Sequence, residues 1–431
     1  MRIVLRYNGG MSFKSAVKKI PGYNALVKPL HYEQAVAADI RYGWPAKKLR
    51  VIGVTGTNGK TTTCFMIWKM LNESGHRAGI LSTVGWATGG DDLRQQVEHM
   101  TTERVEVLNE RMRAVADAGA EFLVLEVTSH ALSQSRILGV PIEIAVFTNL
   151  AHEHLDYHGT LEKYRAAKLK LFKKSRYGVV NADDKNSRFF QEIYSSGDIL
   201  TYGIERGELR ATDIELKSDG VEYSCGDMLI KTQIPGRFNI YNSLAAVGVG
   251  KRLGLTNEEI EHGIAALESV EGRMTRVREG QDFEVIVDYA HTPDALEKVF
   301  ESIEGHPGRI IAVHGGAGQR DSSTRAMRGE ILGRESDIVI ITEDDSRDED
   351  PAEIAQMFVD GVMRHGKVLG RNLFVELDRR RAIEKAIGMA RTGDLVLLLG
   401  KGHEKTILRA DGPHDFEDIK VAQEVLRSAV S

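Results

Sequence analysis

The amino-acid sequence predicts an α/β protein in which a doubly wound domain is followed by a second α/β domain. Three features of the sequence lead to this prediction. Short β-branched apolar runs alternate with helical patterns, a glycine-rich turn follows the first of these runs, and short alternating runs interrupt the pattern at residues 211–234. A chain of 431 residues has room for two or three domains with buried cores.

The first 50 residues form a short basic lead. They hold ten Lys or Arg residues but only two acidic ones, Glu33 and Asp39, and Pro21, Pro29 and Pro45 prevent a single long helix. We expect a solvated arm that packs on the next domain; contact with an anionic substrate or a membrane surface is the alternative.

We divide the chain into three parts, residues 1–48, 49–269 and 270–431.

Residues 51–63, VIGVTGTNGKTTT, predict a buried parallel strand that turns through three glycines into a helix at 61–74. The glycines allow backbone N–H groups to close around phosphate oxygens, Lys60 would neutralise the outer phosphates, and Thr61 would offer a hydroxyl to magnesium. An NTP is the expected ligand. The strict P-loop has glycine where Val54 stands, and the alternative is a glycine turn that only joins strand to helix.

The other elements of the first α/β domain extend to about residue 268. Strands are predicted at 51–55, 122–127, 144–149 and 178–181, helices at 105–118, 161–173 and 242–253, and a small β-meander at 211–234. The second domain begins near residue 270, with strands at 285–288, 310–314, 338–342 and 395–399. Doubly wound sheets bind their ligands at the carboxyl ends of their strands.

Composition narrows the classes of function. Hydrophobic residues make up 42% of the chain and charged residues 28%, which is ordinary for a soluble globular protein, and a net charge of -5 argues against a general nucleic-acid binder. Cys64 and Cys225 supply neither a disulfide framework nor a cysteine metal cluster, so a reducing compartment is expected. Because the sequence has no run of about 18 apolar residues and no signal peptide, we expect a cytoplasmic protein.

Candidate metal ligands follow two of the predicted strands. Glu126 closes the run FLVLEV, where a carboxylate that faces the glycine loop would hold magnesium or polarise water. The strand at 144–149 leads into TNLAHEHLDYHG, which offers His152, Glu153, His154, Asp156 and His158. The alternative for this second group is a set of surface polar side chains.

An ordered series of motifs runs from the glycine loop to the end of the chain. It comprises TGTNGKTTT, EVTSHAL at 126–132, TNLAHEHLDYHG at 148–159, YRAAKLKLF at 164–172, GRFNIYNSLAA at 236–246, GRM at 272–274, DYAHTPDAL at 288–296 and LGKGHE at 399–404. The series resembles the ATP-dependent Mur ligases, most nearly the UDP-N-acetylmuramoyl-tripeptide synthetase (MurE) type. The resemblance covers residues 49–431 and implies a central P-loop ATPase domain and a C-terminal Rossmann-like domain that brings in the amino acid.

The resemblance also implies roles for individual residues. Lys60 and Thr61 would bind the ATP phosphates and a first Mg²⁺ ion, and Glu126 with His154 would hold a second. Lys168 would carry a carbamate, which turns a cation into an anion that draws magnesium into place; an ordinary solvated helix lysine is the alternative. The implied catalytic residues are Lys60, Glu126, His154 and Lys168. The implied ATP-binding residues are Gly56, Thr57, Asn58, Gly59, Lys60, Thr61, Thr62, Asn239, Asn242, Asp288, His291 and Arg325.

The implied substrates are a UDP-muramyl peptide and a diamino acid. The residues expected to contact the nucleotide-sugar peptide are Thr101, Thr102, Thr128, Ser129, Gln134 and Arg136, and those for the amino acid are Arg320, Asp344, Asp345, Arg347, Gly400 and Glu404. Members of the type that add meso-diaminopimelate carry DNPR, whose arginine grips the distal carboxylate as a bidentate fork. Here the stretch is DDSR: Arg347 is kept, whereas Asp345 and Ser346 depart from the pattern. The resemblance thus favours diaminopimelate, with lysine or another diamino acid next.

The implied reaction is amide formation by a monomer. A substrate carboxylate attacks the γ-phosphate of ATP to give an acyl phosphate, and the amine of the amino acid then displaces phosphate. The family has a nucleotide-sugar domain before the phosphate loop, which residues 1–48 do not resemble, so either a reduced site holds the uridine end or the acceptor differs.

Two other functions remain open. A folate-tailing glutamate ligase of the same superfamily usually has the sequence DGAHNP where this chain has DYAHTP. This difference favours a ligase that acts on a UDP-muramyl peptide. A non-catalytic NTP-dependent switch or scaffold would leave His154, Lys168 and Arg320 without a chemical task.

Overall fold

The computed structural model describes residues 27–90, 92–96, 100–151, 153, 155–195, 197–217 and 219–430. The elements of the first half are α3 (Lys28–Tyr42), η1 (Pro45–Lys48), β1 (Arg50–Thr55), α4 (Lys60–Glu73), β2 (Ala78–Leu81), β3 (Gly85–Ala87), β4 (Arg94–Gln95), α5 (Val105–Asp117), β5 (Phe122–Glu126), α6 (Ser129–Ser133), β6 (Ile142–Phe147), α7 (Leu155–His158), α8 (Leu161–Phe172), β7 (Ser175–Asn181), α9 (Ser187–Gln191), β8 (Ile199–Gly203) and β9 (Leu209–Arg210).

The elements of the second half are β10 (Thr212–Lys217), β11 (Gly220–Cys225), β12 (Met228–Thr232), α10 (Phe238–Leu253), α11 (Asn257–Ala265), β13 (Thr275–Arg276), β14 (Glu284–Asp288), α12 (Pro293–Ser302), β15 (Ile310–Gly316), η2 (Ser322–Thr324), α13 (Arg325–Glu335), β16 (Ile338–Glu343), α14 (Pro351–Met363), β17 (Leu373–Val375), α15 (Arg379–Met389), β18 (Leu395–Leu399), β19 (Thr406–Arg409), β20 (Gly412–Asp415) and α16 (Asp418–Val430). Among the described residues, no helix is long and apolar enough to cross a membrane.

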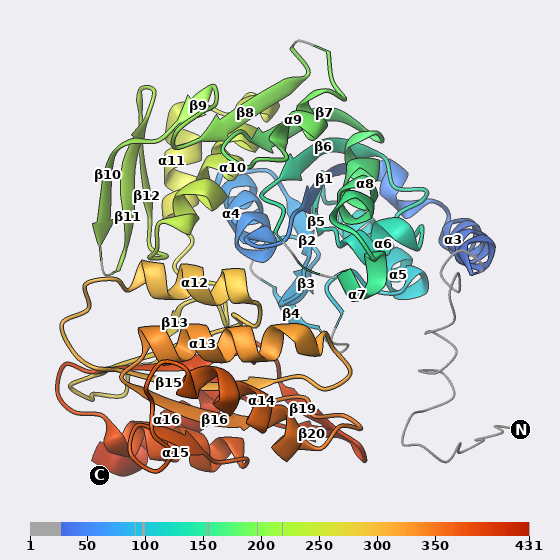
Figure 1. Ribbon diagram of the computed structural model, residues 1–431. Helices are drawn as coiled ribbons and strands as arrows, with labels where there is room; N and C mark the ends of the chain where they lie inside the picture. Colours follow the sequence, from blue (N-terminus) through green and yellow to red (C-terminus); the bar gives the residue numbers. More distant parts are fainter. Residues whose placement is uncertain are drawn as a thin grey trace, which may run out of the picture.

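The larger sheet has the strand order β4-β3-β2-β5-β1-β6-β7-β8-β9 and is parallel from β2 to β9, with β3 and β4 antiparallel at one edge (Figure 1). Strand β1 lies between β5 and β6; the chain places β2 to β5 on one side of it and then β6 to β9 on the other. The carboxyl end of β1 is therefore the topological switch point, where sheets of this kind bind ligands. The predicted doubly wound fold is confirmed.

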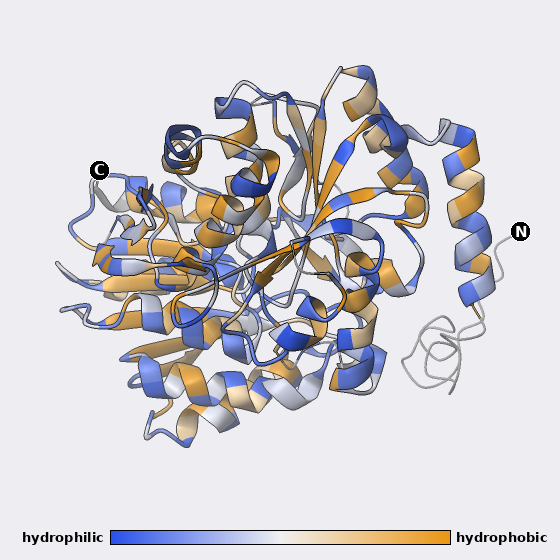
Figure 2. Ribbon diagram, turned by 90° about the horizontal axis from the view of Figure 1, so that it is seen from above, coloured by the Kyte–Doolittle hydropathy of each residue, from blue (hydrophilic) through white to orange (hydrophobic). Residues whose placement is uncertain are grey.

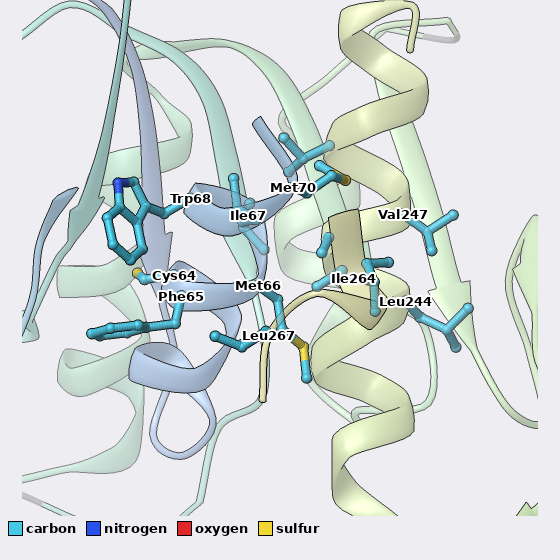
Figure 3. Packing of buried hydrophobic residues seen from close by; sticks show 14 of the residues in the cluster. Cys64, Phe65, Met66, Ile67, Trp68, Met70, Leu244, Val247, Ile264 and Leu267 are labelled. Carbon is cyan, nitrogen blue, oxygen red and sulfur yellow. The ribbon is translucent and has the colours of Figure 1, made fainter. Parts of the chain in front are cut away.

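Helices cover both faces of this sheet. The cluster of buried residues on one face draws on α4, α10, α11 and the three-stranded sheet β10-β11-β12, and the cluster on the other face draws on α5, α6, α8 and α9. Helix α4 is enclosed by the sheet, α10 and α11, so Met66 and Met70 pack beside Leu244 and Ile264 (Figure 3). A helix enclosed in this way is apolar nearly all round, which explains why its sequence lacks a polar stripe.

The second sheet has the order β13-β14-β18-β15-β16-β17 and is parallel except for β13. Its two faces are covered by α12, α13 and α14 and by α15 and α16, respectively. Figure 2 shows apolar residues concentrated on the strands, whereas the helices carry both apolar and polar residues. The predicted second α/β domain is confirmed, although the sequence analysis missed the short strand β17 and the hairpin of β19 and β20.

Several elements differ in their bounds from the prediction, and strands β2, β3, β4, β8, β9 and β13 were not predicted. The helix predicted at 242–253 begins earlier, at Phe238, because Asn239 Nδ2 donates to the carbonyl of Pro235 (2.7 Å) and holds the first turn. Strand β6 ends at Phe147, since the polar residues after it enter the loop. Helix α3 packs Ala35 and Ala38 against Val105 of α5; residues 1–26 of the predicted basic lead lie outside the described part of the chain.

Candidate active site

A cavity lies between the carboxyl ends of the two sheets. It is lined by the glycine loop after β1, the ends of β5 and α10, the linker before β13, and loops of the second domain. The predicted residues that line it are Thr57, Asn58, Gly59, Lys60, Thr61, Thr62, Thr101, Glu126, Thr128, Asn239, Asn242, Asp288, His291, Arg320, Asp344, Asp345, Arg347, Gly400 and Glu404. The predicted residues that do not line it are Gly56, Thr102, Ser129, Gln134, Arg136, Lys168 and Arg325. His154 lies outside the described residues.

The glycine loop has the shape of a phosphate cradle. Gly59, the N-cap of α4, has φ +81°, and a β-carbon there would collide with the side chain of Asn242. Helix α4 begins at Lys60, so its unpaired N–H groups and the positive end of its dipole face the cavity. The ammonium of Lys60 donates to the carbonyl of Thr57 at 2.6 Å. This loop fits a polyphosphate.

Beside the loop, hydroxyl and carboxylate oxygens converge. The hydroxyl of Thr61 lies 3.1 Å from both oxygens of Glu126, and both the backbone N–H and the hydroxyl of Thr83 donate to Glu126 at 2.9 Å. Such oxygen donors beside a phosphate site suit magnesium. Sequence analysis missed Thr83, which no local pattern marks.

The histidine-rich stretch after β6 separates in the structure. Glu153 lines the cavity, whereas the buried ring of His158 pairs with the hydroxyl of Ser129 at 3.0 Å and is not part of the cavity wall. His152 and His154 lie outside the described residues. The structure therefore brings Glu153, but not His158, to the phosphate loop.

Lys168 is buried, and the alternative of a solvated helix lysine is wrong. Its side chain is 1% exposed, its ammonium donates to the carbonyl of Gly56 at 2.6 Å, and the same atom lies 4.5 Å from the centroid of the Tyr164 ring. Burial lowers the pKa of Lys168 well below its usual value, and the nearby charge of Lys60 lowers it further. The environment thus favours the neutral amine behind the glycine loop.

The arginine that reaches the cavity from α13 is Arg328, not the predicted Arg325. Arg325 is 1% exposed and donates to the carbonyl of Ala317 (3.0 Å) and to Glu349 (2.8 Å), contacts within the second domain. Arg328, nearly one turn further on, lines the cavity and donates to the carbonyl of His291 at 3.1 Å. The two arginines are three residues apart, which is why sequence matching alone did not separate their roles.

Four of the residues predicted to contact the nucleotide-sugar peptide, Thr102, Thr128, Gln134 and Arg136, form one network at the edge of the cavity, whereas Ser129 pairs with His158. The hydroxyl of Thr102 donates to the carbonyl of Glu126 (2.9 Å) and accepts from the N–H of Thr128 (3.0 Å). Arg136 donates to Gln134 at 2.6 Å and also to the carbonyl of Thr102. Thr128 and Thr101 thus face the cavity, while Thr102, Gln134 and Arg136 support them from behind.

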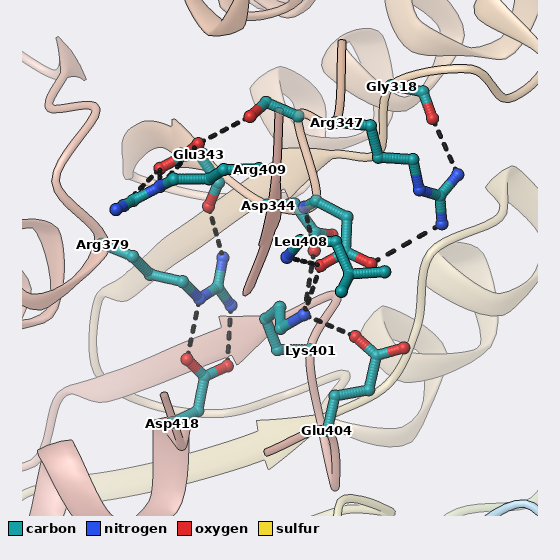
Figure 4. Close-up of polar contacts among 12 residues, drawn as sticks. Gly318, Glu343, Asp344, Arg347, Arg379, Lys401, Glu404, Leu408, Arg409 and Asp418 are labelled. Carbon is teal, nitrogen blue, oxygen red and sulfur yellow. Dashed lines mark hydrogen bonds and ion pairs between the residues drawn. The ribbon is translucent and has the colours of Figure 1, made fainter. Parts of the chain in front are cut away.

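Charges of both signs meet at the far end of the cavity, around β16 and β18 (Figure 4). One oxygen from each of Asp344, Asp345 and Glu404 lies within 4.8 Å of the others. Arg347 lies 3.6 Å from Asp345 and donates to the carbonyl of Gly318 at 2.9 Å. Burial lowers the pKa of Arg347, and the like charge of Arg320 lowers it further. A ligand with a carboxylate would relieve this repulsion.

Ser346, which departs from the DNPR pattern, has a role in the loop after β16. Its hydroxyl donates to Glu343 at 2.7 Å, and Glu343 accepts from Arg409 of β19 at 2.7 Å. Its backbone N–H donates to the carbonyl of Asp344 at 2.9 Å, a bond that proline would not make. The departure is therefore compatible with an ordered loop.

The two domains touch across the cavity. Arg273, from the linker, donates to the hydroxyl of Thr61 at 3.2 Å and lies over the ring of Tyr289. The amide of Asn58 in the glycine loop donates to Asp294 of α12. Sequence analysis noticed Arg273 only as part of the motif GRM; its charge within a linker was the signal that would have found it.

A phosphate-binding loop at the switch point of one sheet, facing a charged pocket at the strand ends of a second, defines a two-domain ATP-using α/β enzyme. The family model for the Mur ligase middle domain matches residues 54–250, and that for the Mur ligase glutamate ligase domain matches residues 272–402. The chain belongs to the Mur ligase family, whose members are ATP-dependent, ADP-forming amide ligases.

Relatives support this assignment over most of the chain. A UDP-N-acetylmuramoyl-L-alanyl-D-glutamate–2,6-diaminopimelate ligase of Syntrophomonas wolfei is 40% identical over 409 residues, which cover 92% of this chain and 82% of that protein. A UDP-N-acetylmuramyl-tripeptide synthetase of Roseiflexus is 39% identical over 407 residues, covering 89% and 80% of the two chains.

Solved structures show the same fold. A structure of a diaminopimelate ligase of the same name as the first relative has a TM-score of 0.63 and 29% identity, and it covers 92% of this chain and 83% of its own. A folylpolyglutamate synthase of Mycobacterium tuberculosis has a TM-score of 0.71 but 16% identity, with 94% and 97% covered. The second likeness is one of fold alone.

Proposed function

We propose that the protein joins meso-diaminopimelate to UDP-N-acetylmuramoyl-L-alanyl-D-glutamate, with cleavage of ATP to ADP and phosphate, in the synthesis of a peptidoglycan precursor. Lysine is the second candidate amino acid. The observation that carries the choice is the pairing of opposite charges at the far end of the cavity, where Arg347 lies 3.6 Å from Asp345 and Glu404 lines the same wall. The distal end of diaminopimelate carries both a carboxylate and an ammonium group, whereas that of lysine carries only an ammonium group.

The phosphate end of the cavity supports the ATP part of the proposal. The N-terminus of α4 and the ammonium of Lys60 would hold the β- and γ-phosphates, and Asn239, Asn242, Asp288 and His291 would surround the nucleoside. Thr61 would hold one Mg²⁺ ion, and Glu126, with His154 by resemblance, would hold a second. Bound magnesium offsets the negative charge that opposes attack of a carboxylate on a triphosphate.

The reaction then needs an acceptor carboxylate beside the γ-phosphate. Thr101 and Thr128 would position the muramyl peptide so that its carboxylate oxygen attacks phosphorus and ADP leaves. The amine of diaminopimelate, oriented by Arg320, Arg347 and Glu404, attacks the carbonyl carbon of the acyl phosphate, and phosphate departs as the amine loses a proton. A carbamate on Lys168 would place a negative charge directly behind the glycine loop, and the lowered pKa of the buried amine favours the neutral form that reacts with carbon dioxide.

Nucleotide-linked precursors and ATP are cytoplasmic, so we also assign the protein to the cytoplasm, as a monomer that acts on small molecules. We take residues 49–269 as the ATPase unit and residues 270–431 as the amino-acid unit. For the uridine end we keep both alternatives, a reduced site or a different acceptor; residues 1–26 lie outside the described part of the chain.

The test is a phosphate-release assay with a panel of UDP-muramyl peptides and amino acids. We expect release only when UDP-muramyl dipeptide and a diamino acid are both present, with diaminopimelate preferred over lysine. Lys60→Ala, which removes the phosphate-binding ammonium, is the inactive control and should remain folded. Turnover with a folate and glutamate would replace the proposal with the folate-ligase function, and turnover without any amino acid would replace it with an NTPase switch.

A further inference from the structure

We propose that Lys401 is a positioning residue that holds the carboxylates of Asp345 and Glu404 in the orientation with which they receive the ammonium group of the diamino acid. The inference deepens the proposed function and rests on it. Lys401 belongs to none of the groups of residues assigned above to substrates, because its side chain is 0% exposed and it does not line the cavity. Its partners do line the cavity.

The geometry is that of one ammonium group behind three carboxylates. Lys401 Nζ lies 2.6 Å from Glu404 Oε2, 2.8 Å from Asp345 Oδ1 and 3.5 Å from Asp344 Oδ1 (Figure 4). Asp344 and Asp345 follow β16, whereas Glu404 follows β18. The ammonium group of Lys401 therefore links the loops that follow these two strands. The N–H of Leu408 also donates to Asp345 Oδ1 at 3.0 Å.

The charges explain why a cation is required at this place. Three carboxylates whose oxygens lie within 4.8 Å of one another repel strongly in a buried site, and an ammonium group between them offsets that repulsion. Burial alone would lower the pKa of Lys401, but Asp344, Glu404 and Asp345 together outweigh it and raise the pKa above its usual value. Lys401 therefore stays charged, and the outward-facing parts of Asp345 and Glu404 are held in place.

Asp345 adds a carboxylate to the group that surrounds Lys401, whereas the DNPR pattern has an uncharged asparagine at that position. The interaction between Lys401 and residue 345 is therefore stronger in this chain. Removing the charge of Lys401 should harm the pocket less when Asp345 is also uncharged. This expectation defines a double-mutant cycle of Lys401→Met, Asp345→Asn and the double variant. Methionine keeps the length of the lysine stem, and Lys420→Met, at an exposed position of α16, is the matched control.

The experiment measures the KM values for the diamino acid and for ATP, separately, in all five proteins. We expect Lys401→Met to raise the KM for the diamino acid by roughly tenfold to a hundredfold, the worth of a charge-assisted contact, with the KM for ATP within about twofold of wild type. Lys401→Met should raise the KM for the diamino acid by a smaller factor in the Asp345→Asn background than in wild type. An unchanged amino-acid KM, an equal rise in the KM for ATP, or additive effects of the two substitutions would overturn the inference.

If Lys401→Met is insoluble, the double variant is compared with Asp345→Asn. A rise in the KM for the diamino acid without an equal rise in the KM for ATP supports the inference, and an equal rise or no rise overturns it. Melting temperatures need no substrate and test the pairing independently. Lys401→Met should lower the melting temperature less in the Asp345→Asn background than in wild type. Equal decreases in the two backgrounds would contradict the pairing of Lys401 with Asp345. Failure of the proposed function is a separate result, seen when wild type accepts no diamino acid.

Discussion

At the scale of single residues, charged groups inside this protein differ in what surrounds them. Lys168 has a carbonyl and an aromatic ring beside its ammonium group, and its pKa is lowered by burial and by Lys60. Lys401 has three carboxylates, and its pKa is raised despite burial. Two buried lysines of one chain thus favour opposite charge states, because the immediate partners decide the sign.

The first prediction concerns Lys168. If the neutral amine takes up carbon dioxide, Lys168→Ala should remove most activity, and wild-type activity should fall when bicarbonate and carbon dioxide are removed from the buffer. The measurement is the rate of phosphate release in degassed buffer, before and after bicarbonate is restored. Lys170→Ala, on the same helix, is the control. Full activity of Lys168→Ala would assign the lysine to packing alone.

The second prediction concerns Arg347. Arg347→Ala should lose a charge-assisted contact with the distal carboxylate worth roughly 1.5–3 kcal/mol, about a tenfold to hundredfold loss in kcat/KM for diaminopimelate. Arg347 also supports the loop at Gly318, so the comparison with lysine is essential. Lysine, which lacks the carboxylate, should lose much less. Equal losses with both amino acids would mean that Arg347 only supports the loop.

At the scale of elements, one buried ion pair ties strand ends to helices beneath the amino-acid pocket. Arg379, at the start of α15, pairs with Asp418, at the start of α16, at 2.7 Å with both side chains 0% exposed. The same guanidinium donates to the carbonyls of Glu343 (3.3 Å) and Leu399 (3.1 Å), the last residues of β16 and β18. Asp344 and Gly400, which line the cavity, follow directly.

The third prediction follows from this pair. Arg379→Met leaves a buried carboxylate without its partner and should lower the free energy of unfolding by roughly 3–5 kcal/mol. Arg380→Met, at the next position, removes an exposed pair with Glu424 and should cost less than about 1 kcal/mol. Urea unfolding of both variants measures the difference. Similar small losses for the two would show that Arg379 does not hold the strand ends together.

At the scale of the whole molecule, the two domains meet around the cavity through few polar contacts. Asn58 of the glycine loop donates to Asp294, which also accepts from Lys298 at 2.6 Å, and Arg273 reaches Thr61. These contacts come from the two halves of the chain and surround the phosphate loop. An acyl phosphate formed there would need protection from water, which closure of the domains would provide.

The fourth prediction tests this closure. Asp294→Ala removes the acceptor for Asn58, so water should enter more often and the ratio of phosphate released to amide formed should rise. Glu297→Ala, on the same helix, pairs with Arg334 inside the second domain and is the matched control. Product analysis by chromatography alongside phosphate release gives the ratio. A ratio that stays at one in Asp294→Ala would show that this contact does not seal the cavity.

The sequence by itself determined the fold class, the glycine loop and the membership of the family. These depend on local patterns: β-branched runs, glycines before a helix and motifs in a constant order, all of which act within a few residues. The strands that were not predicted, β2, β3, β4, β8, β9, β13, β17, β19 and β20, have two to five residues each, and such short runs carry little periodicity.

Only the tertiary structure decided which charged residues face the cavity. Lys168 is buried behind the loop, Arg328 rather than Arg325 lines the wall, and Lys401 lies between carboxylates of two strand ends. The reason is that burial and pairing arise from residues far apart in the chain. A lysine on a helix has the same local sequence whether it is solvated or enclosed, and the difference comes from what packs against it.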